Sequence, residues 1–272
     1  MVAFLRLYEE KGGFFARFKK RFRKVLPEIQ QIPVEGGLPF FIIHTPVYRD
    51  EIPWEEISEI VRINHLNLTL PPGMSLPKEQ RISLFQMEEF PRVVGFNTFL
   101  YLLERFKAPA IKRSVGVVDL RGSFINEFTR LIDLAGDITI VTSRPYLYEN
   151  LKDWAMEQRG AAIHVCGDIH RIERYRTVFL PNGLMMDIPG GGGIFSCKEA
   201  VARSRRIVTG QEICLPEEYL ALLPDGYDPY VFAAVLYEQC NVKTLNYLVY
   251  QKFMLDDREI NLFDALSVLG GT

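Results

Sequence analysis

The residues of this chain that are best suited to chemistry lie in short polar loops, most of which follow an apolar segment. In sequence order the loops read Asp119-Leu120-Arg121-Gly122-Ser123, Thr142-Ser143-Arg144-Pro145, Gly167-Asp168 and Gly190-Gly191-Gly192-Gly193. Guanidinium groups, hydroxyl groups and glycine amides bind phosphate and other anions, whereas carboxylates bind cations. The loops therefore indicate a ligand site, but they identify neither a reaction nor a catalytic residue.

A dinucleotide site is the first hypothesis. Such a site has three glycines in the first turn after a strand, because the backbone must approach the pyrophosphate; this turn has Gly122 alone. The second turn fits better, since an arginine directly after a strand can bind the 2′-phosphate of NADP with its planar fork. The residues predicted to bind the cofactor are Arg121, Gly122, Ser123, Ser143, Arg144, Asp168, Gly190 and Gly191. Alternatively, Arg144 pairs with a nearby acid or is solvated.

Residues 110–215 are similar in pattern to shikimate-dehydrogenase-like and dipicolinate-synthase-like proteins, and the motif that carries this similarity is Thr142-Ser143-Arg144. The resemblance implies a catalytic β-α-β unit ahead of a Rossmann-like cofactor domain, with NADP as cofactor and an oxidoreductase-like activity. The glycine triplet of those families is missing here, so no catalytic residue is transferred from them.

A phosphatase is the second hypothesis. The order Asp119, Thr142-Ser143, Gly167-Asp168 resembles haloacid-dehalogenase-type phosphotransferases, in which the first Asp is the nucleophile and the later Gly-Asp helps to hold magnesium. The second acid of that family is replaced by Arg121, and its phosphate-binding lysine is missing. Without that acid the leaving group has no proton donor. In the alternative interpretation, both Asp residues cap turns.

A noncatalytic α/β protein that binds a partner on the same scaffold is the third hypothesis, and it accounts for the missing glycines directly. The C-terminal region is rich in aromatic residues, which either pack onto the sheet or form a homodimer interface: Tyr227, Tyr230, Phe232, Tyr237, Tyr247, Tyr250 and Phe253. The four histidines and four cysteines lack the spacing of metal ligands, and the cysteines are expected to be reduced thiols.

The elements that would position these loops are strands and helices in alternation. Strands are predicted at 114–119, 137–142, 161–166, 177–180 and 184–188. Ser123 is expected to cap one helix, a second helix would turn Leu147, Leu151 and Trp154 inward, and a third would run from Ser196 to Arg205. This alternation predicts a Rossmann-like, doubly wound and mostly parallel α/β sheet, in which the four loops meet at the C-terminal ends of the strands.

The N-terminal part predicts a smaller β-α-β unit, with strands at 39–44 and 65–70 and a helix from Pro53. A linker at 73–90 and a helix at 92–106 would follow, and the C-terminal region has a helical pattern that includes an Asp228-Pro229 helix start. The predicted regions are therefore 1–90, 91–215 and 216–272. Residues 13–26 predict a basic amphipathic helix that either docks by its Phe face or lies on an anionic membrane.

Composition narrows the classes of protein. The chain has 272 residues and a formal charge of −2, which argues against a protein that coats nucleic acid. No apolar run approaches the roughly 20 residues of a transmembrane helix, and the first residues lack the pattern of a secretion signal. The sequence thus predicts a cytoplasmic protein with a small-molecule ligand, and a homo-oligomer is an open alternative.

Overall fold

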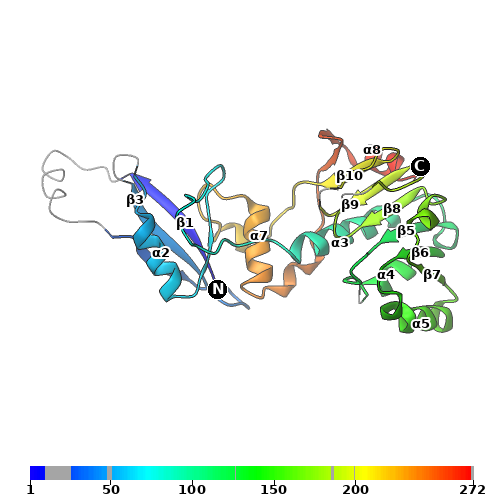
Figure 1. Cartoon of the computed structure of the whole chain (residues 1–272), viewed down its shortest axis with the longest axis horizontal. Coiled ribbons are helices and arrows are strands. Elements are labelled where there is room, and N and C mark those ends of the chain that lie inside the picture. Colours follow the sequence, from blue (N-terminus) through cyan, green and yellow to red (C-terminus); the bar gives the residue numbers. More distant parts are fainter. Residues whose placement is uncertain (10–25, 48–50, 126, 185–186, 199, 271–272) are drawn as a thin grey trace, which may run out of the picture. The chain divides into compact units, whose positions relative to one another are not determined.

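The computed structural model describes residues 1–9, 26–47, 51–125, 127–184, 187–198 and 200–270 (Figure 1). The chain divides into two compact units, here called unit 1 (Met1–Phe90 and Leu215–Leu245) and unit 2 (Pro91–Cys214 and Asn246–Thr272). Residues 216–272, which the sequence predicts as one region, are thus divided between both units. Apart from Leu26, the predicted basic helix lies outside the described residues.

Unit 1 is built on a four-stranded sheet in the order β2-β3-β1-β4. Its strands are β1 (Val2–Glu9), β2 (Glu28–Ile32), β3 (Phe40–Val47) and β4 (Asn67–Thr69), and its helices are α2 (Trp54–Ile63), α6 (Glu217–Leu220) and α7 (Pro229–Glu238). β1 is parallel to β3 and to β4, whereas β2 is antiparallel to β3. The predicted β-α-β unit is therefore present as β3-α2-β4, and β1, which the sequence analysis did not predict, lies between its two strands.

Apolar side chains cover both faces of this sheet, because successive residues of a strand point to opposite sides. On one face, Ile43 of β3 packs with Ile57 of α2. On the other face, Phe4 and Phe40 contact Phe232 of α7 with ring centroids 5.6 and 5.4 Å apart. The sheet is thus enclosed between α2 and α7, and α7 comes from the second stretch of sequence in unit 1.

The start of α7 agrees with the sequence prediction. Oδ1 of Asp228 accepts hydrogen bonds from the backbone amides of Tyr230 and Val231 at 2.7 and 3.3 Å. Pro229 occupies the first helical position, where its missing N–H is not needed. Local sequence alone is enough to define this helix start.

Unit 2 is built on an eight-stranded sheet in the order β12-β11-β10-β9-β8-β5-β6-β7. Its strands are β5 (Ser114–Val118), β6 (Asp137–Val141), β7 (Ala162–Cys166), β8 (Thr177–Leu180), β9 (Gly193–Ser196), β10 (Arg206–Gly210), β11 (Phe253–Leu255) and β12 (Arg258–Ile260). The remaining helices are α3 (Phe90–Glu104), α4 (Phe128–Ile132), α5 (Glu149–Arg159) and α8 (Leu262–Val268), with 3-10 turns at Ala110–Lys112, Pro145–Tyr148, Ile169–Ile172 and Lys243–Tyr247.

The strands β5 to β10 are all parallel to one another. β6 and β7 follow β5 on one side, and β8, β9 and β10 follow it on the other. This is the strand order of the Rossmann fold, and it places the point where the order reverses between β5 and β8. The predicted Rossmann-like α/β fold is therefore confirmed.

Helix α3 covers one face of the central strands with aromatic side chains. Phe99 stacks on Phe179 of β8 with ring centroids 4.7 Å apart, and Phe195 of β9 stacks on Phe179 at 6.5 Å. On the opposite face Ile194 belongs to an apolar cluster with Ile172 from a 3-10 turn. The sheet thus has an apolar layer on each side, and its polar loops emerge at the strand ends.

The helix predicted to follow the glycine run is absent from the described residues between Ser196 and Arg205. β9 begins at Gly193 instead, and its two central residues, Ile194 and Phe195, are buried on opposite faces of the sheet. The capping pattern that starts at Ser196 therefore gave a wrong prediction, because Ser196 ends β9 and its hydroxyl donates to the Lys198 carbonyl at 2.6 Å instead of accepting from a helix amide.

Other details also differ from the prediction. Ser123 does not cap a helix, because α4 begins only at Phe128. Trp154 is 36% exposed, although it was expected to point inward. The predicted strand at 184–188 is not formed by its described residues, of which Leu184 makes an isolated bridge to Ala200. The C-terminal region contains the antiparallel β11-β12 hairpin besides its helices. Among the described residues, no helix has both the length and the apolar character that crossing a bilayer requires.

Candidate functional site

Three of the polar loops lie together at the C-terminal ends of β5, β6 and β7. Backbone hydrogen bonds continue beyond the paired strands: the amide of Ser143 donates to the carbonyl of Leu120 at 3.2 Å, and the amide of Thr142 donates to that of Cys166 at 2.8 Å. The first turn is thus bonded to the second, and the second turn to the end of β7. Side chains from separate parts of the sequence meet at this edge.

Asp119 is the best connected side chain at this edge. It is completely buried, and its Oδ2 accepts hydrogen bonds from the amide of Phe124 at 2.9 Å and the hydroxyl of Tyr148 at 2.6 Å. Its Oδ1 accepts from the Ser123 hydroxyl and from Nδ2 of Asn182, both at 3.2 Å. These donors compensate for the loss of water around the carboxylate.

This arrangement does not suit Asp119 as the nucleophile of a phosphatase. A nucleophile must be accessible to its substrate, but both oxygens of Asp119 are engaged and the residue is 0% exposed. Burial, reinforced by Asp119, raises the pKa of Tyr148, so its phenol keeps the proton that it donates. Asp119 therefore anchors the first turn.

The first turn is closely packed around Gly122. Its φ is +67°, and a Cβ at this position would lie 2.5 Å from Cδ1 of Leu147. Leu147 thus packs directly against Gly122, on the side where a Cβ would lie. The amide of Phe124 bonds to Asp119 and is not free for an anion. The residues of this turn do not fit the pyrophosphate of NADP in its usual position.

The second turn is open to solvent. The amide of Arg144 donates to Oγ1 of Thr142 at 3.1 Å, and the side chains of Ser143 and Arg144 are exposed. Arg121, which follows Leu120, is exposed as well. Within the described part of the chain, the side chains of Arg121 and Arg144 have no hydrogen-bond or ion-pair partner. Two free guanidinium groups on adjacent turns are suited to an oxyanion.

Asp168 has a local role in the third loop. Its Oδ1 accepts from the amide of His170 at 3.0 Å and caps the 3-10 turn Ile169–Ile172. Nδ1 of His170 lies 2.8 Å from Oε1 of Glu173, and this hydrogen bond raises the pKa of His170. The capping interpretation accounts for these contacts, and a ligand contact of Asp168 stays a prediction.

The prediction that the glycine run lies beside the other loops is wrong. Gly193 pairs with Thr177 at the start of β8, and Thr177 pairs with Val115 near the start of β5. The glycines therefore lie at the N-terminal edge of the sheet, opposite the polar loops. They lead into a parallel strand, which the chain must enter from that edge. Ligand binding by Gly190 and Gly191 stays a prediction, but at this other edge.

Asn182 and Tyr148 are site residues that sequence reasoning missed. The composition of Pro181-Asn182-Gly183 is typical of a turn, and the segment lies between the strands predicted at 177–180 and 184–188. The position of Asn182 just after β8 could have identified it, because a strand that pairs with β5 brings its own loop to Asp119. For Tyr148 the sequence offers no comparable signal.

Metal ligands and cysteine thiols are the remaining groups of the chain that could do chemistry. Within the described ranges, no group of three or more His, Cys, Asp or Glu residues is placed to hold a metal ion. The cysteines Cys166, Cys197, Cys214 and Cys240 are all free of disulfides. Burial raises the pKa of the Cys240 thiol to about 12 and also raises that of Cys197. Both thiols are therefore protonated and weakly nucleophilic near neutral pH.

Comparison with known protein families and with curated proteins gives no match to this sequence. Among solved structures, the chain is similar to the Delta(1)-pyrroline-2-carboxylate reductase of Thermococcus litoralis in complex with NADH and L-proline. The identity is 11% and the TM-score 0.28, over 63% of this chain and 57% of that chain. This chain thus aligns with less than two thirds of the reductase. A similarity of this extent carries no conclusion about activity, and the fold assignment rests on the strand order described above.

Proposed function

We propose that unit 2 binds a nucleotide at the C-terminal ends of β5 and β6, and that Arg144 and Arg121 hold a phosphate of this ligand. The supporting observation is the hydrogen bond from Ser143 to Leu120, which joins the two turns. Arg144 follows Ser143, and Arg121 follows Leu120. Both arginines are exposed, and neither side chain has a partner in the described part of the chain. Ligands of open α/β sheets bind at this edge.

The preferred ligand carries a phosphate on its ribose. An arginine after the second strand can form a bidentate contact with a 2′-phosphate, and the Ser143 hydroxyl can add another hydrogen bond. The first turn is closed by Asp119 and Leu147. A dinucleotide would therefore have its pyrophosphate outside that turn. We expect the protein to bind NADP and 2′-AMP more tightly than NAD.

A noncatalytic binding protein on the same scaffold is the second candidate. Asp119 is the acid at the end of the central strand, and its hydrogen bonds leave it no capacity to act on a substrate. A protein that needs this scaffold only for recognition can keep such a closed turn. Under this candidate the protein binds its nucleotide without converting it.

Thermal unfolding with added ligands tests the nucleotide proposal. Millimolar NADP and 2′-AMP should raise the melting temperature more than NAD does, because a ligand of the folded state stabilises it by mass action. Arg144→Ala should remove the preference for NADP. Arg258→Ala, an exposed arginine of β12 at the far end of the unit 2 sheet, is the matched control and should preserve the preference. The proposal fails if no nucleotide raises the melting temperature, or if Arg144→Ala weakens NAD and NADP equally.

A further inference from the structure

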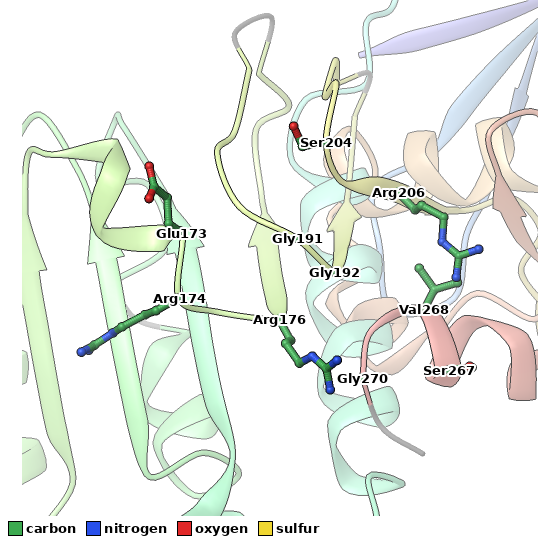
Figure 2. A pocket seen from close by; sticks show the side chains of 10 residues that line it. All are labelled: Glu173, Arg174, Arg176, Gly191, Gly192, Ser204, Arg206, Ser267, Val268 and Gly270. Atoms are coloured by element: carbon green, nitrogen blue, oxygen red, sulfur yellow. The ribbon is translucent and has the colours of Figure 1, made fainter.

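A pocket of about 570 Å³ lies at the N-terminal edge of the unit 2 sheet, opposite the three polar loops. Figure 2 shows the residues that line it. Its walls come from the segments that lead into β8, β9 and β10 and from the end of α8, represented by Arg176, Gly192, Arg206 and Val268. This volume is in the range of roughly 300–1,000 Å³ that small-molecule sites occupy. The pocket contains the glycine run that the sequence analysis singled out.

The uncompensated charge of this pocket comes from Arg176 and Arg206. Both are exposed, and within the described residues neither side chain has a hydrogen-bond or ion-pair partner. Arg174 also lines the pocket, but Figure 2 shows its side chain extending away from the other two, and its Nη2 lies 3.5 Å from Oδ1 of Asp137. Glu173 is paired with His170 at 2.8 Å. The balance at the pocket is therefore positive.

Gly192 brings the backbone segments of the two arginines together. The amide of Arg206 donates to the Gly192 carbonyl at 3.2 Å, and the amide of Gly193 donates to the Arg176 carbonyl at 2.9 Å. The φ of Gly192 is +101°, and a Cβ there would lie 2.3 Å from the Arg176 carbonyl oxygen. Only glycine fits this position, so no side chain lies between the backbone segments from which Arg176 and Arg206 extend.

Arg205 fixes the wall of the pocket from inside the protein. It is 4% exposed, and its guanidinium group donates to the carbonyls of Ile172, Tyr175, Pro189 and Gly191 at 2.7 to 2.9 Å. These carbonyls belong to the segment before β8 and to the segment before β9. Both segments are held in place, which is what a preorganised site requires. Arg205 also adds positive charge next to Gly191.

We propose that this pocket binds a small phosphate ester, with its phosphate between Arg176 and Arg206. A phosphate monoester has a charge of about −1.5 to −2 at pH 7, which two guanidinium groups match. Inorganic phosphate fills only a small part of this volume. The hydroxyls of Ser204 and Ser267 also line the pocket and can bond to a neutral polar remainder such as a sugar. This site is independent of the proposed nucleotide function at the opposite edge.

Calorimetric titration of the full chain with ribose 5-phosphate, inorganic phosphate and unphosphorylated ribose tests this inference. Ribose 5-phosphate should bind more tightly than phosphate, and ribose should not bind. Arg176→Gln and Arg206→Gln should each weaken ribose 5-phosphate at least about tenfold, because each removes a charged contact to the phosphate. Arg174→Gln, which changes a lining arginine that points away, is the control and should bind as the unchanged protein does.

A second measurement locates the bound phosphate without any substitution. The amide NMR signals of Gly191 and Gly192 should shift on addition of ribose 5-phosphate, whereas that of Ser143 should not. The inference is overturned if the full chain binds no phosphate ester at millimolar concentration. It is also overturned if Arg144→Gln abolishes binding while Arg176→Gln and Arg206→Gln retain it, since the phosphate would then lie at the other edge.

Discussion

Asn182 donates a hydrogen bond from Nδ2 to Oδ1 of Asp119 at 3.2 Å and thereby connects the end of β8 to the end of β5. These two strands flank the point where the strand order reverses, where open α/β sheets form their ligand crevice. In this chain the side chains of Asp119 and Asn182 meet across that point. The Asp119 carboxylate is therefore occupied at this point, whereas the neighbouring Arg121 and Arg144 are exposed.

Asp119→Asn should lower the free energy of unfolding by about 3 kcal/mol, because an amide cannot accept all the hydrogen bonds that the buried carboxylate accepts. Urea unfolding measures this loss. Asp133→Asn is the matched control: Asp133 pairs with Arg159 at 3.0 Å on the surface and should contribute less than about 1 kcal/mol. Equal effects of both substitutions would contradict the anchoring role of Asp119.

Tyr148→Phe should lower the free energy of unfolding at pH 7 by about 2 kcal/mol, because the hydroxyl donates to a charged group. Burial, followed by the effect of Asp119, raises the pKa of Tyr148 in the folded protein. Above about pH 10 the unfolded chain loses this proton while the folded protein keeps it, so stability that is present at neutral pH decreases as the pH rises.

Urea unfolding as a function of pH measures this effect. Tyr148→Phe should show a shallower loss of stability between about pH 9 and 11 than the unchanged protein. Tyr146→Phe removes a hydroxyl from a side chain that is 63% exposed, and it should leave the stability at pH 7 within about 0.5 kcal/mol. An alkaline slope that Tyr148→Phe leaves unchanged would show that this phenol is not the group responsible.

Arg205→Leu should destabilise unit 2 by about 3–5 kcal/mol, because buried carbonyls lose their donors. Arg205→Lys should recover only part of this loss, since an ammonium group cannot reproduce the planar fork. Hydrogen exchange should show the largest loss of protection around Tyr175 and Gly193. Arg203→Leu, an exposed neighbour, provides the control for the same change of side chain, and a comparable loss there would refute the role of Arg205.

Gly95→Ala should destabilise the protein by about 1–3 kcal/mol, although alanine usually favours a helix by up to about 1 kcal/mol over glycine. A Cβ at Gly95 of α3 would lie 2.2 Å from Sγ of Cys197 and 3.0 Å from its Cβ. In a Cys197→Ala background the sulfur is removed, so the loss caused by Gly95→Ala should be smaller. A double-mutant cycle by urea unfolding measures this coupling, and additive effects would contradict the close contact.

Local patterns were sufficient to predict four of the parallel strands of unit 2, β5 to β8, but not β9 and β10. The segments that contain Val117, Ile140 and Val178 are apolar runs separated by helical segments, and that alternation has few structural solutions. The start of α7 at Asp228 was predicted for the same reason, because a cap depends on a few adjacent residues.

Long-range relationships could not be predicted in this way. The glycine run was predicted at the C-terminal edge of the sheet, but it lies at the N-terminal edge. The edge depends on whether a helix or a strand follows the glycines, and the pairing of β9 with β8 decides between the two. The Asp119 network joins residues from three loops, among them Tyr148 and Asn182, and no local spacing reports such contacts. Arg205 belongs to a predicted helix in the sequence but is a buried donor to distant carbonyls in the structure. A charged residue gives no sequence signal for such burial.

The interleaving of the two units has a consequence for the order of events during translation. Phe4 and Phe40 leave the ribosome early, but Phe232, which covers them, belongs to the second stretch of unit 1. The sheet of unit 2 likewise lacks β11 and β12 until the residues after 245 have been synthesised. Neither unit can finish folding before its second stretch of sequence has been synthesised, and a nascent chain exposes an aromatic surface in the meantime. Fragments for expression should therefore not be cut between residues 91 and 245, because such a cut separates both units from parts of their own cores.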